Sequence, residues 1–342
     1  MNSPLFRLAG LLVAFAATFA DGQTSVEELP PLRRNFGEVA APVPRFPEGR
    51  FEPRPGETIA WLGGTDVFNL DRHDFLEIGL HLAWPDWRLR WRNLAWQGDT
   101  IYRQARPLHF YTRKGDPQPG SIPDHRERTE PGIVFIGFGK MESLEGIERL
   151  PDFIAAYKAL LDSLAPLTGR VVLLAPAPFF PAGPAASEVT SRNEGLRRYV
   201  EAIRELAGQR GLLFVDGFGP LLGELKAGYS DNGVHLNAAG HRAYAAHLLA
   251  RLGASVSDSD EADPARDRSL RQAIQCKNRL WQQYYRPSNW AFLFGDRQHV
   301  PASRDVKNRD ERWFVREIDA IPPLIAKSEA DIHHYARPAE KP

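Results

Sequence analysis

Thiols are almost absent from this 342-residue chain, in which Cys276 is the single cysteine. One cysteine cannot form an internal disulfide, and it cannot build a metal centre that needs several thiolates. We therefore interpret Cys276 as a small apolar residue of a helix.

Excess charge is also absent, because Lys and Arg together number 43 and Asp and Glu together number 43. A balanced chain has no electrostatic reason to bind nucleic acid or an anionic membrane, so we expect neither as a partner. With 43% hydrophobic residues, the chain can form one full-sized core with an appendage.

Long hydrophobic runs are missing beyond the first 22 residues. Leu8–Ala17 is apolar, Arg7 precedes it, and the small residues Thr18 and Ala20 follow at offsets suited to cleavage. The run is too short to span a bilayer, so residues 1–22 are predicted to be a secretory signal peptide, with a retained anchor as the alternative. We expect export to the periplasm or beyond the cell, and no integral membrane contact after signal removal.

Nucleotide-binding motifs are missing as well. Gly63-Gly64-Thr65 is too short for a dinucleotide fingerprint, and Gly139-Lys140 lacks the flanking residues of a phosphate loop. A G-x-S-x-G nucleophile elbow is absent too. We expect no cofactor and no metal.

Short apolar runs alternate with helical periods between residues 55 and 253. The predicted strands are Thr58–Leu62, Leu89–Leu94, Ile133–Ile136, Val171–Ala175 and Leu212–Val215, and the predicted helices are Phe75–Ala83, Pro151–Leu164, Asn193–Gln209 and Ala238–Leu252. This order is typical of βαβ units and predicts an α/β three-layer sandwich around a five-stranded parallel sheet.

The segments on either side of this domain differ in composition. Residues 23–54, rich in Pro, Glu and Arg, are predicted to be an N-terminal linker, and the acidic, Ser-rich residues 254–268 a flexible connector. A helical extension over residues 269–342 follows, with helices near 268–284 and 311–336. We expect the aromatic loop between these helices to pack on the main domain, and the extension either to cap the cleft or to cover a sheet edge.

Polar or glycine-rich turns follow four of the predicted strands. Parallel α/β sheets bind ligands at the carboxyl ends of their strands, so these turns should converge. We therefore predict one site that contains Thr65 and His235. The turns are residues 63–66 with Gly64, Thr65 and Asp66, residues 93–100 with Gly98, residues 137–143 with Glu142, and residues 231–237 with Asp231, Asn232 and His235.

The order of these turns resembles the SGNH/GDSL hydrolase superfamily over most of residues 55–252. The resemblance implies a flavodoxin-like strand order and ester hydrolysis. It also shows three replacements: Thr65 stands where the family has its nucleophilic serine, Met141 where it has an asparagine, and Asn232 where it has an aspartate. Lys-Asn-Arg-Leu at 277–280 and Arg-Pro-Ser-Asn at 286–289 resemble the C-terminal extension of secreted, planctomycete-like members.

The resemblance also implies a role for each site residue. Thr65 is the nucleophile or its remnant, His235 the general base, and Asp231 or Asn232 the partner that orients His235. Gly64 and Gly98 belong to the region that holds the oxyanion. The alternatives are structural: Thr65 as a helix cap, Gly98 as a turn glycine and His235 as a helix-entry residue bonded to backbone.

Glu142 lies at a strand end, where a carboxylate must be solvated, paired or used. With Asp66, Asp231 and His235 it is expected to form a carboxylate-rich polar site, unless it pairs with Lys140 or an arginine of the extension. Two further groups carry weaker expectations. Trp61, Trp91 and Trp96 fit either sugar stacking or the core, and His241, His247, His333 and His334 are interpreted as surface histidines.

Two main functions follow from this interpretation. The first is an SGNH-type ester hydrolase that acts on an O-acyl group, such as O-acetyl, of an extracellular carbohydrate. The second is a non-catalytic SGNH-like module that binds a glycan or a partner in the same cleft, and a purely structural secreted domain is a third. The expected ligand is a small-molecule or carbohydrate ester.

Overall fold

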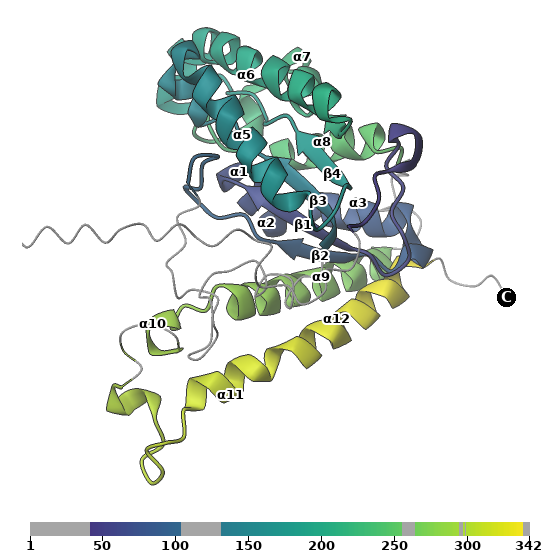
Figure 1. The fold of residues 1–342 in the computed structure, drawn as a ribbon. Helices are drawn as coiled ribbons and strands as arrows, with labels where there is room; N and C mark the ends of the chain where they lie inside the picture. Colours follow the sequence, from purple (N-terminus) through teal and green to yellow (C-terminus); the bar gives the residue numbers. More distant parts are fainter. Residues whose placement is uncertain (1–41, 104–130, 255–263, 294–296, 298, 338–342) are drawn as a thin grey trace, which may run out of the picture.

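The structure, a computed structural model, describes residues 42–103, 131–254, 264–293, 297 and 299–337 (Figure 1). The predicted signal peptide, residues 1–22, lies outside the described residues. Residues 23–41 of the predicted linker and 255–263 of the predicted connector lie outside them as well.

A five-stranded parallel sheet forms the centre of the molecule, in the order β2-β1-β3-β4-β5. Each strand lies within two residues of a predicted apolar run, and the predicted α/β sandwich with a flavodoxin-like order is confirmed. The strands are continuously apolar because helices cover both faces of the sheet. They are β1 Thr58–Gly63, β2 Arg90–Asn93, β3 Pro131–Gly137, β4 Val171–Leu174 and β5 Leu213–Val215.

Helices α5 and α6 pack on one face of the sheet, and α3 and α8 pack on the other. The four longer helices of this domain begin and end close to their predicted bounds. The helices of the domain are α1 Thr65–Phe68, α2 Leu70–His73, α3 Phe75–Ala83, α5 Leu150–Leu164, α6 Val189–Arg210, α7 Phe218–Gly223 and α8 Ala238–Arg251.

Successive side chains of β1 face opposite sides of the sheet and so enter two different cores. Ala60 belongs to the core under α5 and α6, whereas Ile59 and Trp61 belong to the core under α3 and α8. Trp61 is fully buried and Trp91 nearly so, which confirms the core interpretation for both.

In the sheet, β2 and β3 lie on opposite sides of β1. Gly63 and Gly137 end these two neighbouring strands and are paired in register. A Cβ atom on Gly63 would lie 2.5 Å from the carbonyl oxygen of Gly137, so the close approach requires glycine. This switch in strand order opens the crevice in which parallel α/β proteins bind ligands.

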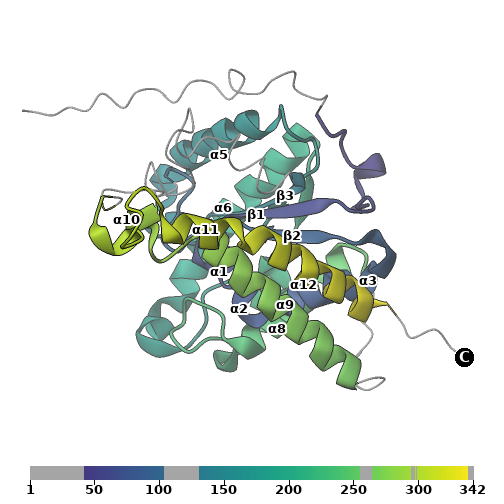
Figure 2. The ribbon, with the colours of Figure 1, turned by 90° about the horizontal axis from the view of Figure 1, so that it is seen from below.

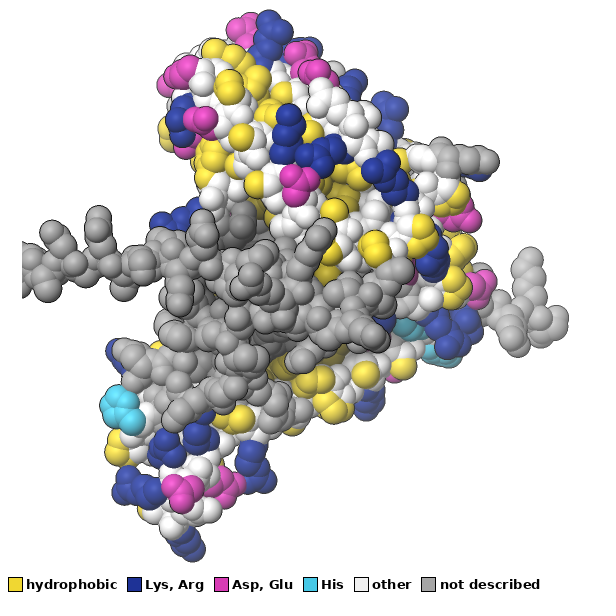
Figure 3. Space-filling model, in the orientation of Figure 1, with side chains coloured by type: hydrophobic (Ala, Val, Ile, Leu, Met, Phe, Trp, Pro, Cys, Tyr) yellow, Lys and Arg dark blue, Asp and Glu magenta, His cyan; other side chains and the backbone are white. Residues whose placement is uncertain are grey.

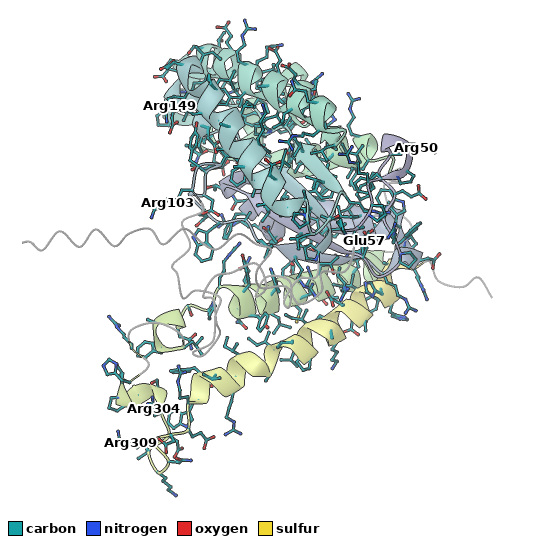
Figure 4. The ribbon with its side chains drawn as sticks, in the orientation of Figure 1. Arg50, Glu57, Arg103, Arg149, Arg304 and Arg309 are labelled. Carbon is teal, nitrogen blue, oxygen red and sulfur yellow. The ribbon has the colours of Figure 1, made fainter. Side chains whose placement is uncertain are left out.

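Residues 42–54, predicted as linker, pack on the domain instead. Val43 forms a parallel bridge with Thr168, and the Phe51 ring stands edge-on to Phe135 at 5.8 Å. The polar composition of residues 42–54 did not predict this packing, because a few aromatic residues suffice to anchor a polar segment. Glu57 and Arg170 form a buried ion pair of 2.9 Å beside this segment. In Figure 4, Glu57 lies on the right of the domain, and Arg103 and Arg149 lie on the left.

The C-terminal extension lies along the β2 edge of the sheet (Figures 1 and 2). Its two long helices form a hairpin, and the Trp281 indole donates a hydrogen bond of 2.9 Å to the carbonyl oxygen of Asn93 in β2. The extension therefore covers a sheet edge, one of the two expected roles. Its helices are α9 Pro264–Tyr285, α10 Trp290–Leu293, α11 Trp313–Asp319 and α12 Ile321–Ala336, so residues 264–268 are helical and not connector.

A buried ion pair ties the extension to the domain. Lys277 of α9 lies 2.6 Å from Glu77 of α3, and both side chains are 1% exposed. Asn278 donates to the other Glu77 oxygen at 2.9 Å. The segment that resembles the planctomycete-like extension thus makes this contact.

The visible, described surface mixes acidic, basic and hydrophobic side chains (Figure 3). Across the described ranges, every helix is too short or too polar to serve as a membrane span.

Candidate active site

A pocket opens at the carboxyl ends of β1 and β3, and both Thr65 and His235 line it. The predicted turns after β1, β2 and β3 and the loop before α8 all contribute residues. The lining consists of Gly64, Thr65, Asp66, Asp99, Gly137, Phe138, Gly139, Lys140, Met141, Glu142, Pro176 and His235.

Thr65 is the first residue of α1, directly after the β1 strand and Gly64. Gly64, and not Thr65, is the N-cap residue of α1, so the capping alternative is wrong. Instead Thr65 Oγ1 accepts a long hydrogen bond of 3.4 Å from the backbone amide of Gly98. Gly98 has a φ of +81°, which favours glycine and aims this amide at the hydroxyl.

His235 is held by Asp66, the residue that follows Thr65. The imidazole Nδ1 lies 3.2 Å from Asp66 Oδ1. A carboxylate accepts at this distance, so Nδ1 carries the proton and Nε2 is the nitrogen that can act as a base. Asp66, which was expected in a carboxylate-rich polar site, thus engages the His235 ring with its side chain.

Neither residue predicted to orient His235 contacts its ring. Asn232 Oδ1 accepts the backbone amides of Val234 and His235, at 2.9 and 2.8 Å, and so shapes the loop. Asp231 is exposed and accepts from the Asn237 side-chain amide at 2.9 Å. Among the described residues, the carboxylate on His235 comes from α1.

Lys140 completes a charged cluster that the sequence did not lead us to expect. Its ammonium lies 3.1 Å from Asp66 Oδ2 and also donates to the carbonyl oxygen of Val234. Burial alone would raise the pKa of Asp66, but the Lys140 charge and the bond to His235 lower it to about 2. Asp66 is therefore a carboxylate throughout the physiological pH range.

Glu142 is buried and accepts two backbone amides, from Ile101 at 2.7 Å and Gly139 at 2.8 Å. The expected pairing with Lys140 is wrong, because Lys140 pairs with Asp66. Burial raises the pKa of Glu142, and the two amides oppose that rise. Glu142 thus ties the turn after β3 to the segment after β2 at the pocket wall.

The rim of the pocket is less polar than the asparagine of the family pattern would make it. Met141, at the place of the family's asparagine, is 43% exposed, and its thioether cannot donate a hydrogen bond. Trp96, two residues before Gly98, is half-buried beneath the Arg286 guanidinium at 4.8 Å from its ring. The extension therefore reaches the loop that carries Gly98.

Within the described ranges, no group of three or more His, Cys, Asp or Glu side chains is arranged to hold a metal ion. What the cleft does provide is a hydroxyl beside a backbone amide, and an imidazole polarised by a carboxylate. These are the groups that acyl transfer uses.

The GDSL-like lipase/acylhydrolase family matches residues 77–243, a range that includes Gly98 and His235 but begins after Thr65. A gut microbial diltiazem-metabolizing enzyme is 14% identical, with 85% of this chain and 98% of that one covered and a TM-score of 0.60. An acetylxylan esterase from Geobacillus stearothermophilus is 18% identical, with 59% and 96% covered and a TM-score of 0.43. No curated protein matches the sequence.

Proposed function

Because the chain belongs to the SGNH/GDSL hydrolase superfamily, we propose that it hydrolyses esters with Thr65 as the nucleophile. The observation that carries this proposal is the contact of 3.2 Å between Asp66 Oδ1 and His235 Nδ1, beside the Thr65 hydroxyl. This contact orients His235 as the general base, a role that Asn232 cannot fill. The missing family aspartate is thus replaced from α1.

The reaction follows from these positions. His235 Nε2 takes the proton as Thr65 Oγ1 attacks the ester carbonyl carbon, and the carbonyl oxygen becomes an oxyanion that the Gly98 amide stabilises. Collapse of this intermediate breaks the bond to the alcohol, which leaves with the proton from His235. A water molecule, deprotonated by His235, then attacks the acyl group on Thr65, and the carboxylic acid and the free hydroxyl are released.

Two features set the expected rate below that of a serine enzyme. The Thr65 methyl group restricts rotation about χ1 and crowds the approach of the ester. Met141 supplies no donor where the family places an asparagine, and loss of one oxyanion donor costs about 10²–10³ in kcat. A slow esterase is the expected result.

The proposed substrate is a small O-acyl ester, such as an O-acetyl group on a carbohydrate. The support is the polar lining, because Asp66, Asp99, Lys140 and His235 border the pocket in which the ester would meet Thr65. One structural neighbour is an acetylxylan esterase and another metabolises diltiazem. A small-molecule ester is therefore the broader class to screen.

A non-catalytic glycan-binding or partner-binding module is the second candidate. Two observations favour it: Met141 replaces a donor, and no direct hydrogen bond links the Thr65 hydroxyl to His235 although both residues are described. In that case the same pocket would bind an acylated ligand and release it unchanged.

Hydrolysis of p-nitrophenyl acetate and of acetylated xylo-oligosaccharides separates the two candidates. The purified protein should release acetate faster than matched samples of Thr65→Ala and His235→Ala. Equal rates for all three proteins would refute the esterase. Calorimetric binding of the same oligosaccharides without turnover would then favour the binding module.

We also propose that the chain is exported with residues 1–22 removed. The support is the short apolar run Leu8–Ala17 behind Arg7. Cell fractionation and N-terminal sequencing of the mature protein test this, and an intact N-terminus in the cytoplasmic fraction would contradict it.

A further inference from the structure

Lys140 places a buried ammonium group in the pocket, where the proposed reaction gives it no step. We propose that Lys140 is a positioning residue that fixes Asp66 and His235 relative to each other and opposes protonation of that pair. The contribution of Lys140 to catalysis rests on the proposed esterase function. The effect of Lys140 on the Asp66–His235 pair can be measured without turnover.

The contacts of Lys140 form a closed ring. Its ammonium bonds Asp66 Oδ2 at 3.1 Å and the carbonyl oxygen of Val234, and Asp66 Oδ1 lies 3.2 Å from His235 Nδ1. Val234 directly precedes His235 in the chain. One side chain from the turn after β3 therefore holds both α1 and the loop before α8, which carry the two members of the pair.

The surroundings of Lys140 make this arrangement rigid. The residue is 5% exposed, and its ammonium lies 5.3 Å from the centre of the Phe179 ring. Its own carbonyl oxygen accepts the Ser143 hydroxyl at 2.7 Å, which holds the turn. A buried ammonium needs partners of this kind, and loss of its charge would leave the Asp66 carboxylate uncompensated.

The charge of Lys140 also acts on proton uptake by the pair. A nearby cation disfavours the addition of a proton to Asp66 and His235, whichever of the two binds it. Removal of the cation should therefore raise the apparent pKa of the pair. The other titratable or charged groups around it are Asp99 after β2, Glu142 after β3, His241 and Tyr244 on α8, and Arg72 and His73 on α2.

The test compares the full-length mature protein with Lys140→Met, Lys140→Gln and Lys140→Arg. Lys158→Met, an exposed lysine of α5, is the matched control. Two quantities are measured in each protein: the NMR titration of the His235 ring, assigned with His235→Asn, and the acid limb of the pH profile of kcat/KM. Circular dichroism establishes which variants fold.

In Lys140→Met and Lys140→Gln, we expect the His235 titration and the acid limb to move to higher pH by about one unit, with kcat/KM lower by roughly ten-fold. Lys140→Arg keeps the charge and should stay close to the wild type in titration, as should Lys158→Met. If Lys140→Met does not fold, Lys140→Gln, which can still donate to one partner, decides the matter.

Two results would overturn the inference. One is an unchanged His235 titration in a folded variant without the charge. The other is an equal loss of activity in Lys140→Arg and Lys140→Gln with no shift in titration, which would mark a purely structural ion pair. If the wild-type protein hydrolyses no ester, the proposed function fails, while the NMR titration still decides the role of Lys140.

Discussion

Asp66 and His235 lie 169 positions apart in the chain and meet side chain to side chain at 3.2 Å. The carboxylate comes from the residue after the proposed nucleophile, and not from the loop that carries the histidine. Asp66 is also bonded to Lys140, so it stays ionised beside the imidazole. The contact between a carboxylate and the catalytic imidazole is thus formed from α1 and not from the loop before α8.

The first prediction concerns the orienting carboxylate. Asp66→Asn keeps the shape but permits the wrong imidazole tautomer, so kcat should fall by about 10³–10⁴. Asp231→Asn is the matched control, because Asp231 is exposed and bonds Asn237. Initial rates on p-nitrophenyl acetate measure both. A larger loss in Asp231→Asn than in Asp66→Asn would contradict this assignment.

The second prediction concerns stability in acid. The Lys140 charge and His235 hold the pKa of Asp66 at about 2, against an ordinary value of 3.8, despite burial. A lowered pKa contributes stability above pH 4 that disappears as the pH falls toward 2. Wild type should therefore exceed Asp66→Asn by about 2 kcal/mol in unfolding free energy at pH 6, with the gap closing near pH 2. Urea unfolding at several pH values measures the gap, and a constant gap would refute the linkage.

The third prediction concerns the reach of the C-terminal extension. The Arg286 guanidinium lies 4.8 Å from the Trp96 ring and 4.7 Å from the Phe68 ring, which belong to the Gly98 loop and to α1. Arg286→Ala should loosen that loop and lower kcat about ten-fold, less than complete loss of a donor. Arg279→Ala, on the exposed side of α9, is the control. Full kcat in Arg286→Ala would show that the extension does not support the site.

The fourth prediction concerns the buried pair Lys277–Glu77. Lys277→Met leaves the Glu77 carboxylate buried without its cation and should cost about 3–5 kcal/mol of unfolding free energy. The double variant Glu77→Met with Lys277→Met removes both charges and should recover most of that loss. Denaturant unfolding measures both variants. A double variant as unstable as the single one would mean that the packing, and not the charge, matters.

The sheet could be predicted from the sequence because both faces of a parallel strand are buried. That burial makes each strand an apolar run, so Val171–Leu174 and Ile133–Ile136 were visible without any tertiary information. The convergence of Thr65 and His235 followed from the same rule, because strand ends share one edge. The packing of residues 42–54 on the domain was harder to predict, since Phe46 and Phe51 are isolated aromatic residues in a polar stretch.

The partner of His235 could not be predicted, because the family resemblance implied Asp231 or Asn232 and not a residue of α1. The burial of Lys140 and its pairing with Asp66 could not be predicted either, since lysine is ordinarily exposed. His241 was different, because its burial could have been predicted. It shares a helical face with Ala245 and Leu248, both buried, and burial with the neighbouring His73 lowers its pKa to about 3, so the surface interpretation of His241 was wrong.

The most direct test of the central claim is covalent labelling by a fluorophosphonate, which reacts with an activated hydroxyl. Mass spectrometry of the peptide that contains Thr65 should show one phosphonyl adduct in the wild type. The adduct should be absent in Thr65→Ala and His235→Ala, whose folding is confirmed by circular dichroism. Ester hydrolysis with no adduct on Thr65, or an adduct that persists in His235→Ala, would contradict a nucleophile at Thr65 activated by His235.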